Sequence, residues 1–371
     1  MSRKQPTLET GLSHESVESL LQWFQRVARE LPWRERRTPY RVWISEIMLQ
    51  QTQVDTVIPF YLRFLKAFPT VESLAAAEED TLMAHWAGLG YYSRARNLQK
   101  AARTLVREHG GCFPSDPEVV RALPGFGEYT TAAVLSLSQG QNLAVLDGNV
   151  MRVLARVFLV EEDIMAGPTR RRLQAIATAG LPAGRAGAYN EALMELGATV
   201  CRPQPSCELC PLASVCRAYA QKRTADIPQR SRRGNRRTHP VVVLVGIAGD
   251  GRILLHRRPD KGMLAGLWEL PNLRGEQELG REPADVESLA SLFDGLERQL
   301  HESGFSARGA YRSLAVFRHH YSHFSVELHP RAALLDGMPG AEDWRWASPP
   351  GLDGLGVSAS DRRILDQWLA E

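Results

Sequence analysis

The chain has 371 residues, enough for two domains that each bury a core of their own. No apolar run in it is long enough to cross a bilayer, and the polar segment 1–16 lacks the apolar centre of a signal peptide, so we expect a cytoplasmic protein without membrane contacts. The formal net charge of +3 is too small to indicate a nucleic-acid partner by itself.

The first part of the chain is predicted to be helical. Over the first 220 residues, apolar side chains recur three and four positions apart, as in Val17, Leu20 and Phe24. Such spacing places them on one face of a helix, where they can pack against a core. We therefore expect an all-α domain over residues 1–225.

Residues 226–239 separate this domain from a part with a different pattern. Arginines crowd the stretch, which we interpret as a solvated linker, with attraction to phosphate as a second possibility. Beyond it, "VVVLVGIAGDGRILLHRR" predicts two strands around a Gly-Asp-Gly turn, and Phe324, Val326 and Leu328 alternate with polar residues. The predicted fold is multidomain: an all-α domain, a basic linker, and a smaller α+β domain over residues 240–371.

Four of the five cysteines lie in one short loop, at Cys201, Cys207, Cys210 and Cys216. In a cytoplasmic chain, clustered thiolates indicate a metal site rather than disulfides. Structural zinc sites usually use two tight Cys-x-x-Cys pairs, and only one such pair is present here. The spacing therefore favours an iron–sulfur cluster over zinc without deciding between them.

The stretch "LPGFGEYTTAAV" predicts a hairpin between two helices. Gly125 and Gly127 allow the backbone to turn sharply and to approach another molecule closely. The amides that begin the next helix then point outward, where a phosphate oxygen can accept hydrogen bonds from them. Tyr129 follows in the first turn of this helix. Because helix pairs often use glycine simply to turn, the hairpin alone is a weak signal.

A possible acid lies farther along, in "LDGNVMRVLAR". We expect Asn149 to cap the helix that follows, which places Asp147 just outside a helix N-terminus. The positive end of the helix dipole should keep this carboxylate ionised.

A second acid lies in "SEIMLQQTQV". Thr52 and Asp55 have the spacing of a capping box, which predicts that a new helix begins at Thr52 and that Gln51 lies at an exposed corner before it. Glu46 lies one turn earlier among apolar neighbours, which disfavour its charged form. One protonated and one ionised carboxyl group are the pair that cleavage of a glycosidic bond requires.

Together, "SEIMLQQTQV", "WAGLGYYSRARNL", "LPGFGEYTTAAVLSL", "LDGNVMRVLAR" and the cysteine loop resemble the MutY family of adenine DNA glycosylases, in the helix-hairpin-helix superfamily that also contains endonuclease III. The likeness covers nearly the whole chain. It implies removal of adenine mispaired with 8-oxoguanine or guanine in duplex DNA by a monomeric enzyme at the nucleoid. It also implies a [4Fe-4S] cluster and a C-terminal domain similar to the MutT (Nudix) fold that reads the oxidised base.

The resemblance gives roles to the four residues around the predicted chemistry. Glu46 matches the catalytic acid, which protonates adenine and later assists the attack of water. Asp147 matches the carboxylate that stabilises the oxocarbenium-like sugar, and Asn149 matches the residue that orients these groups. Tyr129 occupies the hairpin position at which bifunctional relatives carry a Schiff-base lysine. The implied enzyme is therefore a monofunctional glycosylase.

Further positions match residues that contact DNA. Gln51, Thr52, Leu89 and Tyr91 correspond to residues that touch or wedge beside 8-oxoguanine, in agreement with the need to flip a base out of the duplex before acid can reach it. In the C-terminal domain the family's Phe-Ser-His sequence appears as Tyr-Ser-His, which makes Ser322 the expected contact to 8-oxoguanine and His323 a supporting one.

The sequence departs from the family pattern at two places. Five residues separate Cys201 from Cys207, where six are usual, so the loop is tighter or the cluster less secure. The C-terminal domain also lacks the acidic run with which Nudix hydrolases hold magnesium, so we expect no hydrolysis of oxidised dGTP.

Two alternatives remain. One is a glycosylase and lyase similar to endonuclease III, against which the C-terminal domain and the missing lysine count. The other is a DNA-binding or redox-sensing protein without catalysis, against which the presence of Glu46, Asp147 and Asn149 counts.

Overall fold

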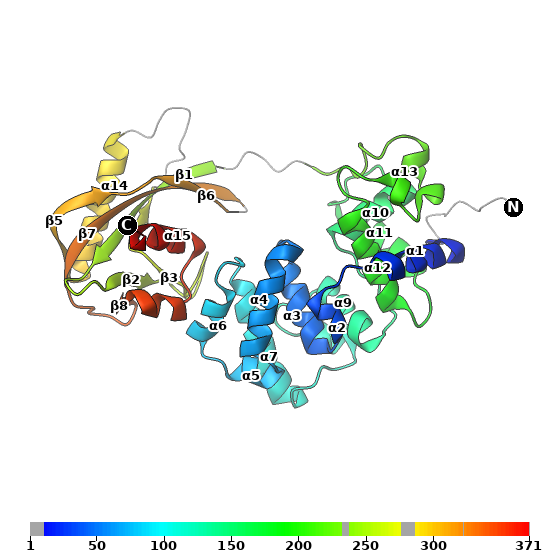
Figure 1. The fold of residues 1–371 in the computed structure, drawn as a ribbon, viewed down its shortest axis with the longest axis horizontal. Coiled ribbons are helices and arrows are strands. Elements are labelled where there is room, and N and C mark those ends of the chain that lie inside the picture. The colour runs from blue at the N-terminus through cyan, green and yellow to red at the C-terminus, as the bar shows by residue number, and fades with distance from the viewer. Residues whose placement is uncertain (1–10, 232–236, 276–285, 322, 371) are drawn as a thin grey trace. The chain divides into compact units, whose positions relative to one another are not determined.

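The structure is a computed structural model that describes residues 11–231, 237–275, 286–321 and 323–370. It forms two compact units (Figure 1). The first unit comprises Met1–Ala75 and Asn97–Arg233, and the second comprises Ala76–Arg96 and Gly234–Glu371. Within the described part of the chain, no helix combines the length and apolar character that a bilayer crossing requires.

The first unit is all-α, as predicted. Its helices are α1 (His14–Val27), α2 (Pro32–Glu35), α3 (Pro39–Leu49), α4 (Val54–Ala67), α5 (Val71–Ala76), α7 (Ser93–His109), α8 (Pro117–Arg121), α9 (Glu128–Gln139), α10 (Gly148–Phe158), α11 (Gly167–Ala179), α12 (Ala186–Thr199) and α13 (Arg217–Ala220), with the 3₁₀ turns η1 (Cys207–Leu209) and η2 (Ala213–Val215). Helices α5 and α7 extend across the boundary between the units.

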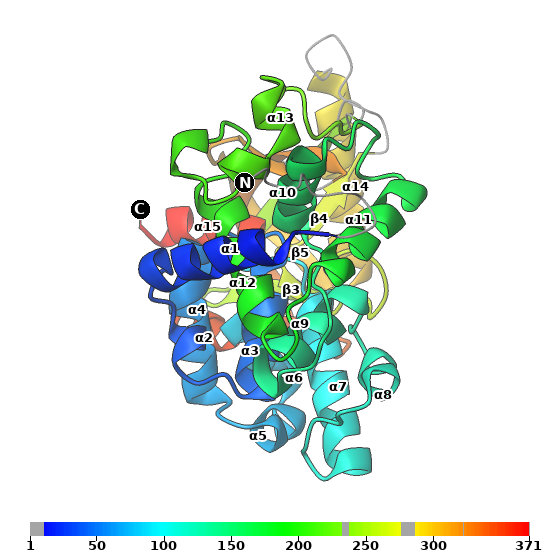
Figure 2. The same ribbon diagram turned by 90° about the vertical axis from the view of Figure 1, so that its right-hand side faces the viewer.

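One core of this unit forms around α10. Val153, Leu154 and Val157 recur at helical spacing and are fully or almost fully buried, together with Leu193 and Leu196 of α12. Helix α1 lies across α12 and adds its own apolar face to this core (Figure 2). Burial of these faces, rather than helix propensity alone, stabilises the arrangement.

A second contact holds α3 against α9. Trp43 of α3 packs its ring against Phe126, with centroids 5.3 Å apart, and against Phe113, at 5.4 Å. Because Phe126 lies in the turn directly before α9, these aromatic contacts fix α3 relative to the start of α9. The contacts therefore determine how the residues of α3 and of the first turn of α9 face each other.

In its described residues, the second unit contains a mixed eight-stranded sheet, in agreement with the predicted α+β domain. Its strands are β1 (Arg237–Ile247), β2 (Ile253–Arg257), β3 (Trp268–Glu269), β4 (Asn272–Arg274), β5 (Phe305–Ser313), β6 (Phe317–His320), β7 (Phe324–Gly337) and β8 (Trp344–Ala347). The main path is β3-β2-β1-β7-β5, with β4 on β1, β6 on β7 and β8 on β2. The pair β1–β7 is parallel, and the other named strand pairs are antiparallel.

Helices cover both faces of this sheet. Val241, Val243 and Val245 of β1 share a core with α15 (Ala359–Leu369), whereas Val242 and Leu244 share another with α14 (Val286–Glu302). In Figure 1, α14 and α15 accordingly lie on opposite faces. Successive side chains of a strand point to opposite faces, so the continuous apolar run of β1 is what a strand covered on both sides needs. The unit also contains α6 (Glu79–Trp86) and the 3₁₀ turn η3 (Pro349–Gly354).

Two predicted helix starts are wrong by one or two residues. Helix α4 begins at Val54 with Gln53 at its N-cap, so the expected capping box at Thr52 does not form. Helix α10 is capped by Asp147, whose side chain accepts a hydrogen bond from the Val150 amide, and Asn149 lies inside the helix. Asp and Asn are both good N-caps, and these two lie close together in the sequence. Local sequence therefore could not decide which of them caps α10.

Candidate active site

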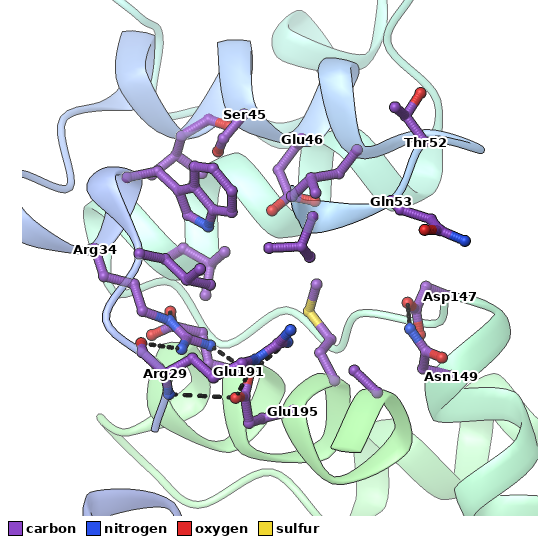
Figure 3. A pocket seen from close by; sticks show the side chains of 18 of the residues that line it. Arg29, Arg34, Ser45, Glu46, Thr52, Gln53, Asp147, Asn149, Glu191 and Glu195 are labelled. Atoms are coloured by element: carbon purple, nitrogen blue, oxygen red, sulfur yellow. Dashed lines mark hydrogen bonds and ion pairs between the residues drawn. The ribbon is translucent and has the colours of Figure 1, made fainter. Parts of the chain in front are cut away.

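A cavity of about 430 Å³ opens among the helices of the first unit. In Figure 3, Glu46 on α3 lies on one side, Asp147 and Asn149 at the start of α10 lie on another, and a group of charged residues faces them. Tyr129 of α9 also lines this cavity. The four residues that the sequence associated with catalysis are therefore brought together.

Glu46 is the acid at the centre of this site. It lies in α3 and is only 3% exposed, so the surface position that a single glutamate usually takes does not apply. The Tyr129 hydroxyl donates a hydrogen bond to Glu46 Oε2. Burial raises the pKa of Glu46 to about 7, although the hydrogen bond from Tyr129 acts in the opposite direction. A substantial fraction of this side chain therefore carries a proton at neutral pH.

Tyr129 stands in the first turn of α9, whose N-cap is Gly127. Burial, together with the nearby acids Glu46 and Asp147, raises the pKa of the Tyr129 phenol well above its usual value. The phenol therefore stays neutral and acts as a hydrogen-bond donor. It cannot act as an amine nucleophile.

Asp147 is held by hydrogen bonds from its own helix. Its Oδ1 accepts from the Val150 amide at 2.7 Å and its Oδ2 accepts from Asn149 Nδ2 at 3.1 Å. We expected the helix terminus to keep this group ionised. Burial nevertheless raises the pKa of Asp147, and the hydrogen bonds from Val150 and Asn149 offset only part of this effect.

A further arginine supports Asn149. Arg152 donates to Asn149 Oδ1 at 2.8 Å, to the Gly197 carbonyl at 2.8 Å and to the Cys201 carbonyl at 2.7 Å. The arginine thus connects the residue beside Asp147 with α12 and with the first cysteine of the loop. Sequence analysis did not identify Arg152, because a single arginine on a helix usually faces solvent.

The remaining wall of the cavity carries charged residues that sequence analysis also missed. Arg29 donates to Glu195 at 2.7 Å, and Arg34 donates to Glu195 at 3.0 Å and to Glu191 at 3.1 Å. Burial alone would raise the pKa of Glu195, but the bonds from Arg29 and Arg34 lower it overall. The available signal was the pair of acids four residues apart in an otherwise apolar helix, since buried carboxylates need a partner.

The predicted hairpin at Gly125 and Gly127 comes directly before Tyr129, and the predicted corner at Gln51 comes directly before Thr52. Tyr129 and Thr52 both line the cavity. Gly125 has a φ of +79°, and a Cβ at this position would lie 2.8 Å from the Asn97 Cβ, so glycine is required there. Gly127 has no such constraint, since a Cβ there would meet nothing within 4 Å. Gln51 is exposed with a φ of +59°, and Thr52 lines the cavity. The exposed corner that the sequence predicted is thus present.

The other predicted DNA-contacting residues belong to the second unit. Leu89 is buried, whereas Tyr91 is 42% exposed and has a φ of +49°. His323 is exposed directly before β7, and Ser322 lies outside the described residues.

The four clustered cysteines line one small cavity of about 20 Å³. No group of three or more His, Cys, Asp or Glu side chains in the described ranges lies close enough together to hold a metal ion. Arg156 contacts the Cys201 sulfur at 3.4 Å and donates to the carbonyls of Arg202, Pro203 and Ile227. This arginine is 2% exposed, and no carboxylate is seen to pair with it in the described structure. A buried cation of this kind fits an anionic group among the thiolates.

The cavity combines the buried carboxyl group of Glu46 with the half-buried one of Asp147. The negative charge of Asp147 raises the pKa of Glu46 further, which favours one proton on the pair. A protonated acid that faces a second carboxylate can protonate a leaving group while the second one stabilises positive charge. Such a pair is suited to cleavage of a glycosidic bond.

Comparison with known families agrees with this chemistry and with the fold. Residues 44–178 match the HhH-GPD superfamily of base excision DNA repair proteins, and residues 242–367 match the NUDIX domain. The fold and the site thus define a base-excision-repair DNA glycosylase with a C-terminal Nudix-like domain. The relatives of the chain show to which family within this superfamily it belongs.

The chain belongs to the adenine DNA glycosylase family. It is 34% identical to the adenine DNA glycosylase of Rattus norvegicus, with 94% of this chain and 76% of that protein aligned. It is 33% identical to the one of Homo sapiens (94% and 72%) and 30% identical to the one of Schizosaccharomyces pombe (92% and 86%). Among solved structures, a thermostable thymine-DNA glycosylase is similar, with 29% identity and a TM-score of 0.50 over 55% of this chain and 95% of that one.

Proposed function

We propose that this enzyme hydrolyses the N-glycosidic bond of adenine paired with 8-oxoguanine or guanine in duplex DNA, and that it leaves the strand intact. The observation that carries the proposal is the buried Glu46, hydrogen-bonded to Tyr129 in a cavity that Asp147 also lines, where burial raises the pKa of Glu46 to about 7. The names of its relatives support adenine as the excised base.

In this proposal the cavity receives the flipped adenine. Its apolar lining, from Leu31, Trp33 and Val42, suits the faces of a base, and the wall formed by Arg29, Arg34, Glu191 and Glu195 suits its polar edge. Glu46 donates its proton to a ring nitrogen of adenine, which makes the base a better leaving group. The resulting carboxylate then assists water in the final attack.

Asp147 stabilises the positive charge that develops on the sugar as the bond breaks. The hydrogen bonds from Val150 and Asn149 hold the carboxylate in place, and Arg152 holds Asn149 in turn. Tyr129 cannot form an imine with the sugar, so water remains the nucleophile. This is the physical reason for proposing a monofunctional glycosylase.

Contacts with DNA are proposed on both units. The hairpin at Gly125 and Gly127 would bind a backbone phosphate, and Gln51 and Thr52 would lie next to the mispair. In the second unit, the exposed Tyr91 would wedge beside 8-oxoguanine, and Ser322 and His323 would read it. Leu89 is buried in this structure and would have to become exposed to contact DNA. We propose domains at 1–225 and 240–371 with a linker at 226–239, in a monomeric enzyme that works at the nucleoid.

We also propose a [4Fe-4S] cluster held by the four clustered cysteines. The convergence of their side chains on one cavity and the buried Arg156 support an anionic cluster there. When bound, such a cluster supplies structural order rather than chemistry to glycosidic cleavage. It would hold the loop from Cys201 to Cys216 next to α10.

Glu46→Gln tests the proposed function. It removes the proton donor but keeps the size of the side chain, and we expect single-turnover excision of adenine to fall by about 10²- to 10⁴-fold while binding of the mispair persists. Glu128→Gln is the matched control, because Glu128 adjoins Tyr129 but does not line the catalytic cavity.

The same reactions identify the product. The strand of the wild-type reaction should break only after alkali or heat, and borohydride should trap no covalent complex. A Glu46→Gln variant with wild-type rates would refute the acid, and efficient trapping would indicate a lyase.

A further inference from the structure

The loop between α9 and α10 leads directly to Asp147 and belongs to no helix or strand. Part of this loop is buried, since Ala144 and Val145 are 7% and 1% exposed. A buried backbone amide or carbonyl without a hydrogen bond is costly, so the backbone of this loop needs partners from elsewhere in the fold. The position of Asp147 therefore depends on the groups that bind the loop.

Asn190 of α12 supplies two of these partners. Its Nδ2 donates to the Leu143 carbonyl at 2.8 Å, and its Oδ1 accepts from the Val145 amide at 3.1 Å. Its Nδ2 also donates to Ser136 Oγ, on α9, at 2.9 Å. A side-chain amide can donate and accept at once, and both of its ends are used here. Asn190 is 1% exposed and does not line the catalytic cavity.

These bonds join three elements that carry parts of the active site. Helix α9 carries Tyr129, the loop ends at Asp147, and α12 carries the acids of the charged wall. The backbones of α12 and α9 come close together at the same place, because a Cβ at Gly187 would lie 2.6 Å from the Ser136 carbonyl oxygen. Asn190 therefore lies where a single side chain can fix the loop to both helices.

The other contacts of the loop act differently. Val145 packs in an apolar cluster with Ala132 and Ala133 of α9, and such packing is not directional. Gln174 of α11 donates to the Ala144 carbonyl at 3.0 Å, which holds one peptide group from another side. Hydrogen bonds depend on angle as well as distance, so the two bonds from Asn190 determine how the peptide groups of the loop are oriented.

We propose that Asn190 is a positioning residue for excision of the base. Through the loop, it holds the Asp147 carboxylate in a fixed place across the cavity from Glu46 (Figure 3). A displaced carboxylate would stabilise the charge on the sugar less well, and a small misplacement of such a group is costly for the rate. This inference rests on the proposed function, since it assumes that Asp147 acts on the sugar.

The test is single-turnover excision of adenine by Asn190→Leu. Leucine fills a similar volume but can make none of the three hydrogen bonds. We expect the rate constant to fall about 10- to 100-fold, equally opposite 8-oxoguanine and opposite guanine, while binding of the mispair persists. Tyr40→Phe is the control, because it also removes a buried hydrogen bond from the first unit and should keep the wild-type rate constant.

The cleavage rate of bound DNA separates positioning from a merely structural role. An unstable variant contains less active enzyme, but the molecules that bind the mispair would cleave it at the wild-type rate. A displaced carboxylate slows the cleavage of bound DNA itself. With active enzyme in excess over DNA and every duplex bound, equal rate constants for Asn190→Leu and the wild type would overturn the proposal.

A milder variant covers the case in which Asn190→Leu does not fold. Ser136→Ala removes only the bond that joins Asn190 to α9, and it should slow excision about 2- to 10-fold, the effect of one lost hydrogen bond. If Asn190→Leu does not fold and Ser136→Ala cleaves bound DNA at the wild-type rate, the proposal is refuted.

The proposed function can fail separately. A wild-type enzyme that does not excise adenine would refute the proposed function, and this inference with it. If the wild type excises adenine and Asp147→Asn is slow, but Asn190→Leu behaves like Tyr40→Phe, only the positioning role is refuted.

Discussion

The hydrogen bond that Tyr129 donates to Glu46 lowers the pKa of this acid. Burial raises the pKa of Glu46 to about 7, and the hydrogen bond from Tyr129 is the largest effect in the opposite direction. The proton donor must be protonated to act, so the excision rate should fall as the pH rises through about 7.

Tyr129→Phe should move this fall to higher pH. The variant loses the hydrogen bond that stabilises the carboxylate, so the pKa of Glu46 rises by up to about one unit, which corresponds to ~0.5–1.5 kcal/mol. The measurement is the pH dependence of single-turnover excision between roughly pH 5.5 and 9.

Tyr40→Phe is a suitable control for this shift. Tyr40 also donates a buried hydrogen bond, to the Phe68 carbonyl at 2.7 Å, but does not line the cavity. It should lower stability without moving the pH profile. Identical profiles for wild type and Tyr129→Phe would mean that the tyrosine does not control the acid.

Active-site residues could be predicted from the sequence where their neighbours form a distinctive pattern. Glu46, Tyr129 and Asp147 were found because each lies next to a turn or a helix start with its own signal, whereas Arg29 and Arg34 have none. Their roles depend on Glu195, far away in the chain, and such a contact cannot be deduced from local spacing. The net pKa shift of Asp147 was equally hidden, because it depends on burial in the folded state.

At the scale of elements, Arg156 joins α10 to the cysteine loop. It donates to three carbonyls of the surrounding chain and to Cys201, from a fully helical and buried position. Its planar guanidinium can make these bonds at once, and an ammonium group cannot.

The purified protein should therefore contain iron, absorb broadly near ~400 nm, and lose iron when Arg156 is changed. Arg156→Lys should lower the iron content per chain and destabilise the fold by about 2–4 kcal/mol, because several buried acceptors lose their donor. Elemental analysis and thermal unfolding measure the two effects. Arg171→Lys, on the exposed surface of α11, should change neither.

Zinc in place of iron in the wild type would refute the cluster. Iron retained at full level by Arg156→Lys would instead mean that the cysteines hold the group without this arginine.

Most helices and the main strands were predictable, because apolar periodicity is a local property. The ends of the elements were not. The strand β1 begins at Arg237, before the apolar run, because residues Arg237–His239 pair in parallel with Phe324–Val326 of β7. Partners of this kind are distant in sequence, and so the extent of a strand is determined by the sheet.

At the scale of the whole molecule, we expect the second unit to recognise 8-oxoguanine and the first unit to cleave the glycosidic bond. Truncation should therefore affect the two functions separately. Removal of residues 237–371 should leave a helical protein that still excises adenine opposite guanine, while its preference for 8-oxoguanine falls toward unity. Circular dichroism and the ratio of the two single-turnover rates measure these effects. Equal preference in the truncated and full-length chains would contradict a reading role of the second unit.

The truncation also has a structural consequence. The segment Ala76–Arg96 belongs to the second unit, where the Tyr92 hydroxyl donates to the Val357 carbonyl at 3.4 Å. Loss of this partner should lower the melting temperature by a few degrees, about the effect of 1 kcal/mol. The membership of this segment was not predicted, since its sequence is helical like that of its neighbours.

The charged wall of the cavity also affects the stage of folding at which the enzyme becomes able to bind a base. Arg29 and Glu195 are 166 residues apart in the chain. During synthesis, the arginines of this wall emerge long before their acids, and such distant pairs form late because closing a long loop costs entropy. A chain that has not yet docked α12 has Glu46 and Tyr129 but lacks the wall opposite them. We therefore expect the ability to bind a base to arise only when α12 has docked and the wall of the cavity is complete.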